Sequence, residues 1–565
     1  MSGRVCRSRG MAPGVWAARA AAGLILYVGL AAWLTWPLAA HLATHLPSTT
    51  SLLFDAIHTA WVLSWEAYSL TTSPLSLPDA NIYHPTPATL FYGQTAFGAL
   101  PYFAPTFLAT GNPTLALNVL FLGGVALTAC TLHLVVYYWT RSHLSGLVAA
   151  WSFLMTRWVL WEVIPTAPQY ALLHYFPLVV LLATIPERRF PSLLVALVVL
   201  QALVDPVYLG AAMLVPLGLL AGGRLVRSET RRAGLQLSVG LALVVLVLFV
   251  SFASHFVVRA ENPNLADQTL WKTPMAAIEF PWGLIGVGAP TAAPLPLVAL
   301  IVLGTMSMLL AGPAAPARRA WAHVALWTAV GIVMSLKPSS LPVLEVFRVP
   351  ARIGVAGLIG VALLAGLAFS ECARRLTVWH RYSPVVLAAI VMMVAYAEFD
   401  RGVSDPRLQR PPLPPYGLFR MAALDTSLAD ALEQSDGPLL EVPVGDGIRS
   451  ARLNARAMYR SIFHWRPLLN GYDGYYPAAF PKRMALARLL PDPNALRALA
   501  EATGLEMVLV NTEDLSPESR ATWMNLAEAG GRDDLRLIDR SRTELLFAVP
   551  PQRSAFNHVP HHERE

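Results

Sequence analysis

Long apolar stretches alternate with short polar segments along residues 1–399. A helix needs about 20 apolar residues to cross roughly 30 Å of hydrocarbon, and most of the stretches approach that length. The candidate crossings are 16–39, 114–140, 144–161, 168–185, 191–204, 206–222, 234–256, 286–312, 320–336, 352–371 and 382–398. The pattern predicts a mostly α, polytopic membrane protein with a bundle of about 11 transmembrane helices.

Two places interrupt this pattern. The stretch 94–110 is short and contains two prolines, so we expect a re-entrant or tilted helix there. The stretches 191–204 and 206–222 meet at Asp205-Pro206, a dipeptide typical of a tight turn. Because Asp205 lies near predicted helix ends, we expect its charge to reach water.

The distribution of basic residues predicts the orientation of the bundle. Cytoplasmic loops carry an excess of Lys and Arg, and clusters of arginines fall before or at the start of the first stretch and in alternate short loops. They are Arg4, Arg7, Arg9, Arg19, Arg141, Arg188, Arg189, Arg224, Arg227, Arg231, Arg232, Arg318, Arg319, Arg374 and Arg375. The amino terminus is therefore predicted to be cytoplasmic, and the first loop (41–93) and the carboxyl-terminal region extracytoplasmic.

The composition changes after residue 399. Residues 400–417 are rich in proline and charge, which indicates a linker between two domains, 1–399 and 418–565. Segments 438–443 and 505–510 are predicted strands, 482–503 a helix, and the region around Ser541-Arg542 a hairpin. We predict a small extracytoplasmic α/β domain with a flexible tail.

Composition supports the membrane assignment and excludes several site classes. Only 14% of the residues are charged, against about a quarter in soluble domains. The net charge of +7 comes largely from the arginine clusters, so we interpret it as topology and expect no nucleic-acid partner. Three cysteines without a CxxC pair, and the absence of phosphate-loop, GxSxG and HExxH motifs, predict no cofactor or metal site. Whether a divalent cation assists is left open.

Asp55 lies in an aromatic segment of the first loop. The aromatic and apolar side chains recur at helical spacing, so we expect a helix in the headgroup plane with this face toward the membrane. His58 and Glu66 share the adjoining stripe with Asp55. At 1.5 Å per residue Glu66 lies about 16 Å from Asp55, which excludes a carboxylate pair. Asp55 is thus a lone candidate base, or alternatively a first-turn carboxylate favoured by the helix dipole.

Further polar residues of the outer segments are candidate substrate contacts. Residues 78–85 combine turn formers with aromatic groups, which suits either a substrate-binding loop or an ordered loop that caps the bundle. The substrate-binding candidates here and beside Asp55 are His58, Glu66, Asp79, Asn81, Tyr83 and His84. Asp267, in the polar loop 259–272, is another candidate, with a plain solvated loop as the alternative.

Phe347-Arg348-Val349-Pro350-Ala351-Arg352 opens a predicted crossing on the outer side. Two guanidinium groups four residues apart, together with the amide donors of a helix start, can bind an anion such as a lipid phosphate. Lys337 is a weaker candidate on the same loop. The alternatives are headgroup anchoring or an ion pair with Glu345.

Residues 461–475 of the carboxyl-terminal domain are rich in aromatic and hydrogen-bonding side chains. Aromatic rings together with Asn, Asp and Arg can hold a sugar. A contact between this domain and the membrane would need the same residues, and both interpretations stay open.

Taken together, these motifs resemble the GT-C superfamily of membrane glycosyltransferases. The motifs are Asp55…Trp61…Trp65, Asp79-Ala80-Asn81-Ile82-Tyr83, Phe347-Arg348-Val349-Pro350-Ala351-Arg352, His464-Trp465-Arg466-Pro467-Leu468 and Asn470-Gly471-Tyr472. The superfamily includes protein O-mannosyltransferases and bacterial aminoarabinose transferases, and the layout resembles an uncharacterised bacterial multi-pass branch. The resemblance spans nearly the whole chain.

The resemblance implies a GT-C-like bundle in a bacterial inner (plasma) membrane. It implies a polyprenyl-phosphate sugar as donor, a glycan, lipid or protein acceptor, and inverting transfer of a hexosyl or pentosyl group. Asp55 would be the base, and Arg348 and Arg352 would steady the departing phosphate. The chain departs from many members because no second carboxylate is paired with Asp55. The alternative is a non-catalytic relative that acts in envelope glycolipid transport or as an assembly scaffold.

Overall fold

The computed structural model describes residues 13–47, 53–156, 158–159, 163, 167–185, 191–267, 295–310, 317–334, 350–404, 418–421, 426–433 and 436–550. Contacts divide the chain into two units. The first comprises Met1–Thr59, Thr95–Ala253 and Thr273–Met421, and the second Ala60–Gln94, Ser254–Lys272 and Ala422–Glu565. The first unit is a helical bundle, and the second contains a five-stranded sheet.

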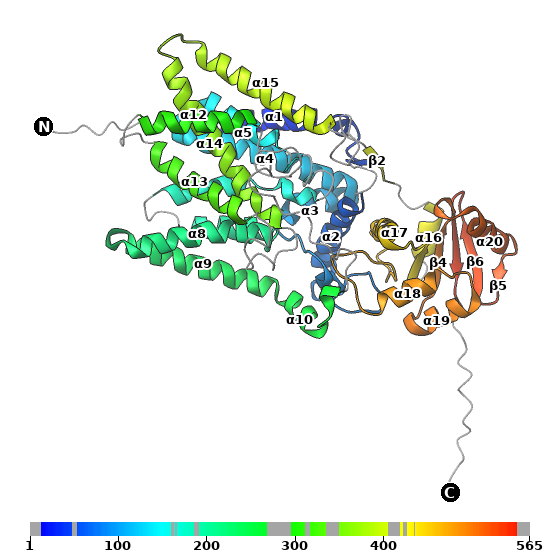
Figure 1. Cartoon of the computed structure of the whole chain (residues 1–565). Helices are drawn as coiled ribbons and strands as arrows, with labels where there is room; N and C mark the ends of the chain where they lie inside the picture. The colour runs from blue at the N-terminus through cyan, green and yellow to red at the C-terminus, as the bar shows by residue number, and fades with distance from the viewer. Residues whose placement is uncertain are drawn as a thin grey trace, which may run out of the picture. The chain divides into compact units, whose positions relative to one another are not determined.

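Each of the eleven predicted apolar stretches overlaps a helix of the structure (Figure 1). These helices are α1 (Pro13–Leu34), α4 (Pro113–Thr140), α5 (His143–Leu154), α6 (Tyr175–Thr184), α7 (Pro191–Ala202), α8 (Tyr208–Val226), α9 (Arg231–Ser251), α12 (Leu295–Leu310), α13 (Ala317–Met334), α14 (Val355–Leu376) and α15 (Ser383–Ser404). Within the described residues, four spans are long and apolar enough to cross a membrane. They are 113–140, 208–226, 228–251 and 352–376. The mostly α fold is confirmed, and the four candidate spans agree with a membrane protein, whereas eleven crossings stay a prediction.

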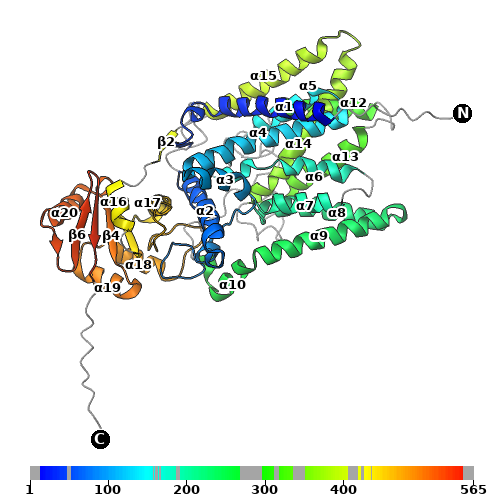
Figure 2. The ribbon, with the colours of Figure 1, turned by 180° about the vertical axis from the view of Figure 1, so that it is seen from behind.

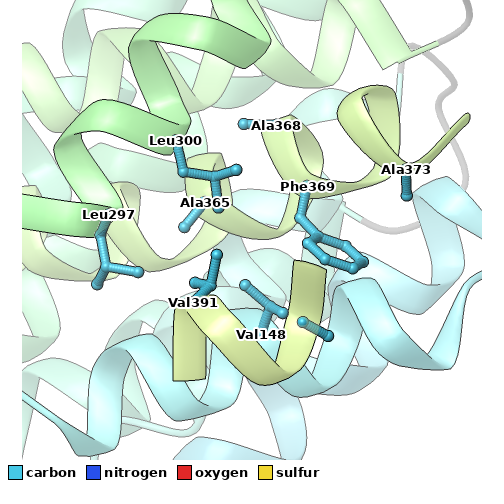
Figure 3. Close-up of a cluster of buried hydrophobic side chains, with 9 residues drawn as sticks. Val148, Leu297, Leu300, Ala365, Ala368, Phe369, Ala373 and Val391 are labelled. Carbon is cyan, nitrogen blue, oxygen red and sulfur yellow. The ribbon is translucent and has the colours of Figure 1, made fainter. Parts of the chain in front are cut away.

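Helix α14 is the centre of the bundle. In its most apolar window 89% of the residues are buried, compared with 17% in α9. Small residues let its neighbours approach closely, because a Cβ on Gly304 would lie 2.3 Å from Cβ of Ala368. Figure 3 shows the buried cluster that includes Ala368, to which α5, α12, α14 and α15 contribute side chains. Its members are Val148, Leu297, Leu300, Ala365, Ala368, Phe369, Ala373, Ala388 and Val391.

Helix α1 packs against α4, as Figure 2 shows most clearly. Just after α1, strand β1 (His45–Pro47) pairs antiparallel with β2 (Leu418–Arg420), which follows the bundle in sequence. Helix α15 continues to Ser404, into the predicted linker, of which residues 405–417 lie outside the described part of the chain. The predicted boundaries at 399 and 417 stay a prediction.

The stretch 94–110 forms α3 (Leu100–Thr110), whose 11 residues are too few to cross the hydrocarbon. The predicted first-loop helix is α2 (Leu53–Thr72). Its aromatic face is buried in protein, so our expectation that this face rests on lipid was wrong. Trp61 Nε1 donates to Asn81 Oδ1 at 3.2 Å, and the ring of Tyr68 stacks on Trp465.

The second unit contains a sheet with strand order β3–β4–β7–β6–β5. Its strands are β3 (Leu439–Val442), β4 (Met507–Asn511), β5 (Gly531–Arg532), β6 (Leu535–Arg540) and β7 (Glu544–Ala548). The β3–β4 pair is parallel and the other pairs are antiparallel, so the predicted strands and the β6–β7 hairpin are present. Figure 1 shows helices α16 to α20 around the sheet.

The helices of this unit are α16 (Thr426–Glu433), α17 (Gly447–Ser461), α18 (Phe480–Ala487), α19 (Pro493–Thr503) and α20 (Pro517–Glu528), with α10 (Ala253–Glu261) nearly all within it. The single helix expected over 482–503 is two helices. Pro491 cannot donate within a helix, and Asp492 then caps α19 by accepting from the N–H of Ala495 at 2.9 Å.

The loop 79–84, though far away in sequence, extends one edge of this sheet. Segment 467–470 runs beside β3, with the Leu439 N–H donating to Pro467 O and the Leu469 N–H to Leu439 O. On its other side, the Leu468 N–H donates to Asn81 O at 2.8 Å and the Tyr83 N–H to Asn470 O at 3.0 Å. The first loop is therefore a structural part of the second unit, which local sequence patterns do not reveal.

A buried ionic cluster lies beneath α17. The guanidinium of Arg460 contacts the carboxylates of Glu441 on β3, at 3.3 Å, and Glu544 on β7. All three side chains are about nine-tenths buried or more. Burial raises the pKa of Glu441, while the charge of Arg460 opposes that rise. The guanidinium of Arg460 therefore holds α17 against β3 and β7, and the two buried carboxylates need its positive charge.

We predict that Arg460→Leu destabilises the second unit by about 3–5 kcal/mol, because two buried carboxylates lose their counter-ion. Thermal unfolding of the full chain in detergent should show a lowered midpoint. The exposed Arg497 on α19 provides the matched control, since Arg497→Leu should change stability by no more than about 0.5 kcal/mol. Equal midpoints for the two variants would contradict this role of Arg460.

Candidate functional site

Asp55 lies in the first turn of α2 and is half-buried. A carboxylate is favoured there by the amide dipoles of the helix start. One turn later, the buried Thr59 hydroxyl reaches Asp55 O at 3.0 Å and Gln169 Oε1 at 3.4 Å. The start of α2 therefore adjoins the 3₁₀ turn η5 (Pro168–Ala171).

The turn η5 is held from two helices of the bundle. The Thr128 hydroxyl on α4 donates to Ala171 O at 2.8 Å, and Gln201 Nε2 on α7 donates to Leu172 O at 2.7 Å. Gly124 of α4 permits the close approach, since a Cβ there would lie 2.9 Å from Cβ of Ala171. These contacts give η5 a fixed position inside the first unit.

Tyr170 on η5 is fully buried, and its hydroxyl donates to Oδ2 of Asp205 in the α7–α8 turn. The Tyr208 N–H donates to Oδ1 at 2.8 Å. Asp205 is only 1% exposed, so our expectation that its charge reaches water was wrong. Burial raises the pKa of Asp205, and the hydrogen bonds and the charge of Arg352 oppose that rise.

Arg352 lies in η10 (Pro350–Gly354), directly before α14. Its guanidinium carbon is 5.2 Å from the ring centre of Tyr170 and 5.6 Å from that of Tyr208. A cation over aromatic rings beside a carboxylate is held in place by cation–π attraction and by charge. Arg348 and Lys337, the other two predicted phosphate-binding residues, lie outside the described residues.

The described residues of the first unit thus connect four separated segments. The start of α2 contacts η5 through Thr59. In turn, η5 contacts the α7–α8 turn through Tyr170. Finally, Arg352 of η10 lies over the Tyr170 ring. The resulting site has a half-buried carboxylate at one end and a buried carboxylate with a guanidinium at the other. Such a set of groups can accept a proton and stabilise an anion.

His58 is half-buried on the Asp55 side of the unit boundary. Glu66 is fully buried and belongs to the second unit, which agrees with the helical spacing that excluded it as a partner of Asp55. Asp267 is exposed in the turn η7 (Leu265–Asp267), also in the second unit. Roles for all three in substrate binding stay predictions.

The candidates of the first loop are engaged in the second unit. Asp79 Oδ1 accepts from the Ala88 N–H at 2.8 Å, and Asn81 Nδ2 donates to Arg466 O at 3.1 Å. The His84 N–H donates to Leu468 O at 3.0 Å, and burial lowers the pKa of its half-buried imidazole. Tyr83 is buried, with its ring edge-to-face against Phe480. These contacts order the loop, and substrate binding by the four residues stays a prediction.

Sequence reasoning did not include Gln169, Tyr170 and Asp205 among the site residues. Gln169 and Tyr170 lie at the edge of an apolar stretch that we predicted to begin a crossing at 168, whereas α6 begins at Tyr175. A signal that could have identified the turn is Pro168 together with the polar Gln169, because turn formers and polar residues at the edge of an apolar stretch favour a turn before the helix. Among the described residues, no group of His, Cys, Asp and Glu is placed to hold a metal ion.

Comparison with known proteins identifies the fold. No family model matches the chain, and no curated protein matches it in sequence. The arabinofuranosyltransferase AftD from mycobacteria superposes with a TM-score of 0.54 at 14% identity, over 94% of this chain. The predicted GT-C-like fold is confirmed. The chain spans 40% of the length of AftD.

The apo oligosaccharyltransferase of Archaeoglobus fulgidus is also similar, with a TM-score of 0.43 at 11% identity, over 95% of this chain and 75% of its own. That score is too low to add to the argument.

We predict that Tyr170→Phe destabilises the first unit by about 1–3 kcal/mol, because a buried carboxylate oxygen loses its donor. A lower thermal midpoint of the full chain in detergent would show this. The control is Tyr382→Phe in the exposed α14–α15 turn, which should leave the midpoint unchanged. If both variants have the thermal midpoint of the wild type, the hydrogen bond from the Tyr170 hydroxyl to Asp205 does not contribute to stability, which would contradict the prediction.

Proposed function

We propose that this chain is an integral membrane glycosyltransferase. It transfers a sugar from a polyprenyl-phosphate-linked donor to a glycan, lipid or protein acceptor on the extracytoplasmic side of a bacterial inner membrane. The observation that carries the proposal is the link from the start of α2 through Gln169 and Tyr170 to Asp205 and Arg352, within a fold shared with an arabinofuranosyltransferase.

In this mechanism Asp55 accepts the proton of the acceptor hydroxyl. The hydroxyl oxygen attacks the anomeric carbon, and the bond from that carbon to the phosphate oxygen of the donor breaks with inversion. The electron pair of that bond stays on the polyprenyl phosphate. Arg352, together with Arg348, stabilises the charge that develops there, since a phosphate leaving group needs charge stabilisation more than a proton.

Asp205 has a supporting role in the proposal. Its carboxylate and the two tyrosine rings hold the Arg352 guanidinium at the start of α14. Preorganised charge costs no rearrangement when the phosphate leaves, and it acts more strongly where water is excluded. The half-buried Asp55 is suited to exchange its proton with an acceptor or with solvent, whereas the buried Asp205 is not.

We predict that Asp55→Asn lowers sugar transfer by about 10²–10⁴-fold, because an amide cannot take the acceptor proton. Purified protein would be incubated with labelled polyprenyl-phosphate sugars and candidate acceptors, and the labelled product measured. The matched control is Glu229→Gln in the exposed loop between α8 and α9, which should transfer at the wild-type rate.

Transfer that survives Asp55→Asn would contradict the role of Asp55. Absence of transfer by the wild type, with specific binding of the lipid-linked sugar retained, would favour glycolipid transport or an assembly scaffold over catalysis.

We predict that Arg352→Gln lowers the turnover number by about 10²–10³-fold, since it removes charge stabilisation of the departing phosphate. Arg352→Lys should recover part of the loss, because the charge is kept while the planar fork is lost. Turnover and KM measured separately, with the thermal midpoint as a folding check, distinguish this role from a structural one. Equal turnover in the Gln and Lys variants would contradict it.

A further inference from the structure

The second unit contains a pocket of about 140 Å³ at the edge of its sheet. This volume is about ten times the roughly 10–15 Å³ that a single water needs, so the pocket has room for a small organic ligand. It is lined by the turn before α17 and the first turns of that helix, by segment 471–476, by Tyr83 and by α18, all within this unit. Its polar and aromatic lining residues include Tyr83, Asp446, Ser450, Tyr472, Asp473 and Tyr476.

The position of the pocket follows from the chain topology. Strand β3 runs parallel to β4, and the turn Gly445-Asp446-Gly447 connects the carboxyl end of β3 to the start of α17. Ligands of α/β domains bind at the carboxyl ends of parallel strands, where the following helix presents free amide donors. Both glycines of the turn line the pocket, so the backbone of this turn is open to a ligand.

Two carboxylates give the pocket its chemical character. Asp446 is exposed at the N-cap position of α17, yet its side chain makes no capping hydrogen bond within the described helix. Asp473 is 6% exposed, and Oδ1 accepts from the Gly474 N–H at 2.7 Å. Because Arg488 is the single basic residue in the lining, the pocket disfavours an anion such as a free phosphate.

Aromatic side chains also line the pocket. The ring of Tyr83 packs on Gly471, where an added Cβ would lie 2.2 Å from the ring, and the ring of Tyr476 is 6.0 Å from that of Phe480. A sugar offers apolar C–H faces to such rings, and its hydroxyl groups can donate to carboxylates and accept from amides. A pocket that combines apolar walls with a few fixed polar groups is typical of small-ligand sites.

We propose that this pocket binds a neutral saccharide unit, with Asp446 and Asp473 accepting hydrogen bonds from its hydroxyl groups and Tyr476 covering one face of its ring. The site belongs to the second unit, whereas Asp55 and Arg352 belong to the first. It is a recognition site for a glycan and takes no part in bond breaking, so it goes beyond the proposed transfer reaction.

The test is saturation-transfer NMR on the full chain in detergent. The probes are methyl α-D-arabinofuranoside, methyl α-D-mannopyranoside and methyl β-D-glucopyranoside, with inorganic phosphate as a competitor. We expect saturation transfer to at least one glycoside, an affinity lowered at least about tenfold in Asp446→Asn and in Tyr476→Ala, and no displacement by phosphate. Asp430→Asn, an exposed carboxylate on α16, is the matched control and should bind as the wild type does.

Absence of saturation transfer to all three glycosides would overturn the proposal, as would wild-type affinity in both pocket variants or displacement of the sugar by phosphate. Thermal midpoints of the variants exclude misfolding as a cause. The pocket proposal is judged by the loss of glycoside binding in the two pocket variants relative to Asp430→Asn, and the transfer mechanism by the loss of sugar transfer in Asp55→Asn, so failure of one is distinguishable from failure of the other.

Discussion

The buried carboxylate of Asp205 is the constraint on which the candidate site depends. A carboxylate that is 1% exposed must be hydrogen-bonded and charge-compensated, because burial without partners costs several kcal/mol. The Tyr170 hydroxyl, the Tyr208 amide and the Arg352 guanidinium meet this need together. Satisfying one charge therefore fixes the positions of η5, the α7–α8 turn and η10.

The same constraint gives the first unit two regions with different chemistry. Around α14, small residues and aliphatic side chains pack closely in an apolar cluster. At η5 the chain forms a short 3₁₀ turn in place of an α-helix, and side chains of α4 and α7 donate hydrogen bonds to the carbonyl groups at its end. Non-helical backbone inside a membrane bundle is tolerated where protein groups satisfy it or where it lines a polar site.

The sequence predicts the helices well because a helix that crosses lipid requires a long apolar stretch, and such stretches are evident in the sequence. It also predicts the strands and hairpin of the second unit, and the resemblance in motifs agrees with the fold. It cannot predict that residues 79–84 pair with 467–470, since the hydrogen bonds join backbones almost 400 residues apart. Nor can it show that Asp205 is buried, because a turn between helices ordinarily meets water.

The second unit has structural features of its own that bear on function. Its sheet edge is completed by the first loop, and its own βα turn frames a pocket with acidic and aromatic walls. Its cohesion depends on the Arg460 cluster, which joins α17 to β3 and β7.

The central claim is that Asp55 and Arg352 act on the same transition state. A double-mutant cycle of Asp55→Asn and Arg352→Gln, read as the rate of sugar transfer, tests it most directly. The account predicts strong non-additivity, with the double variant barely slower than the slower single variant. Losses that multiply would show two independent sites and would contradict the account.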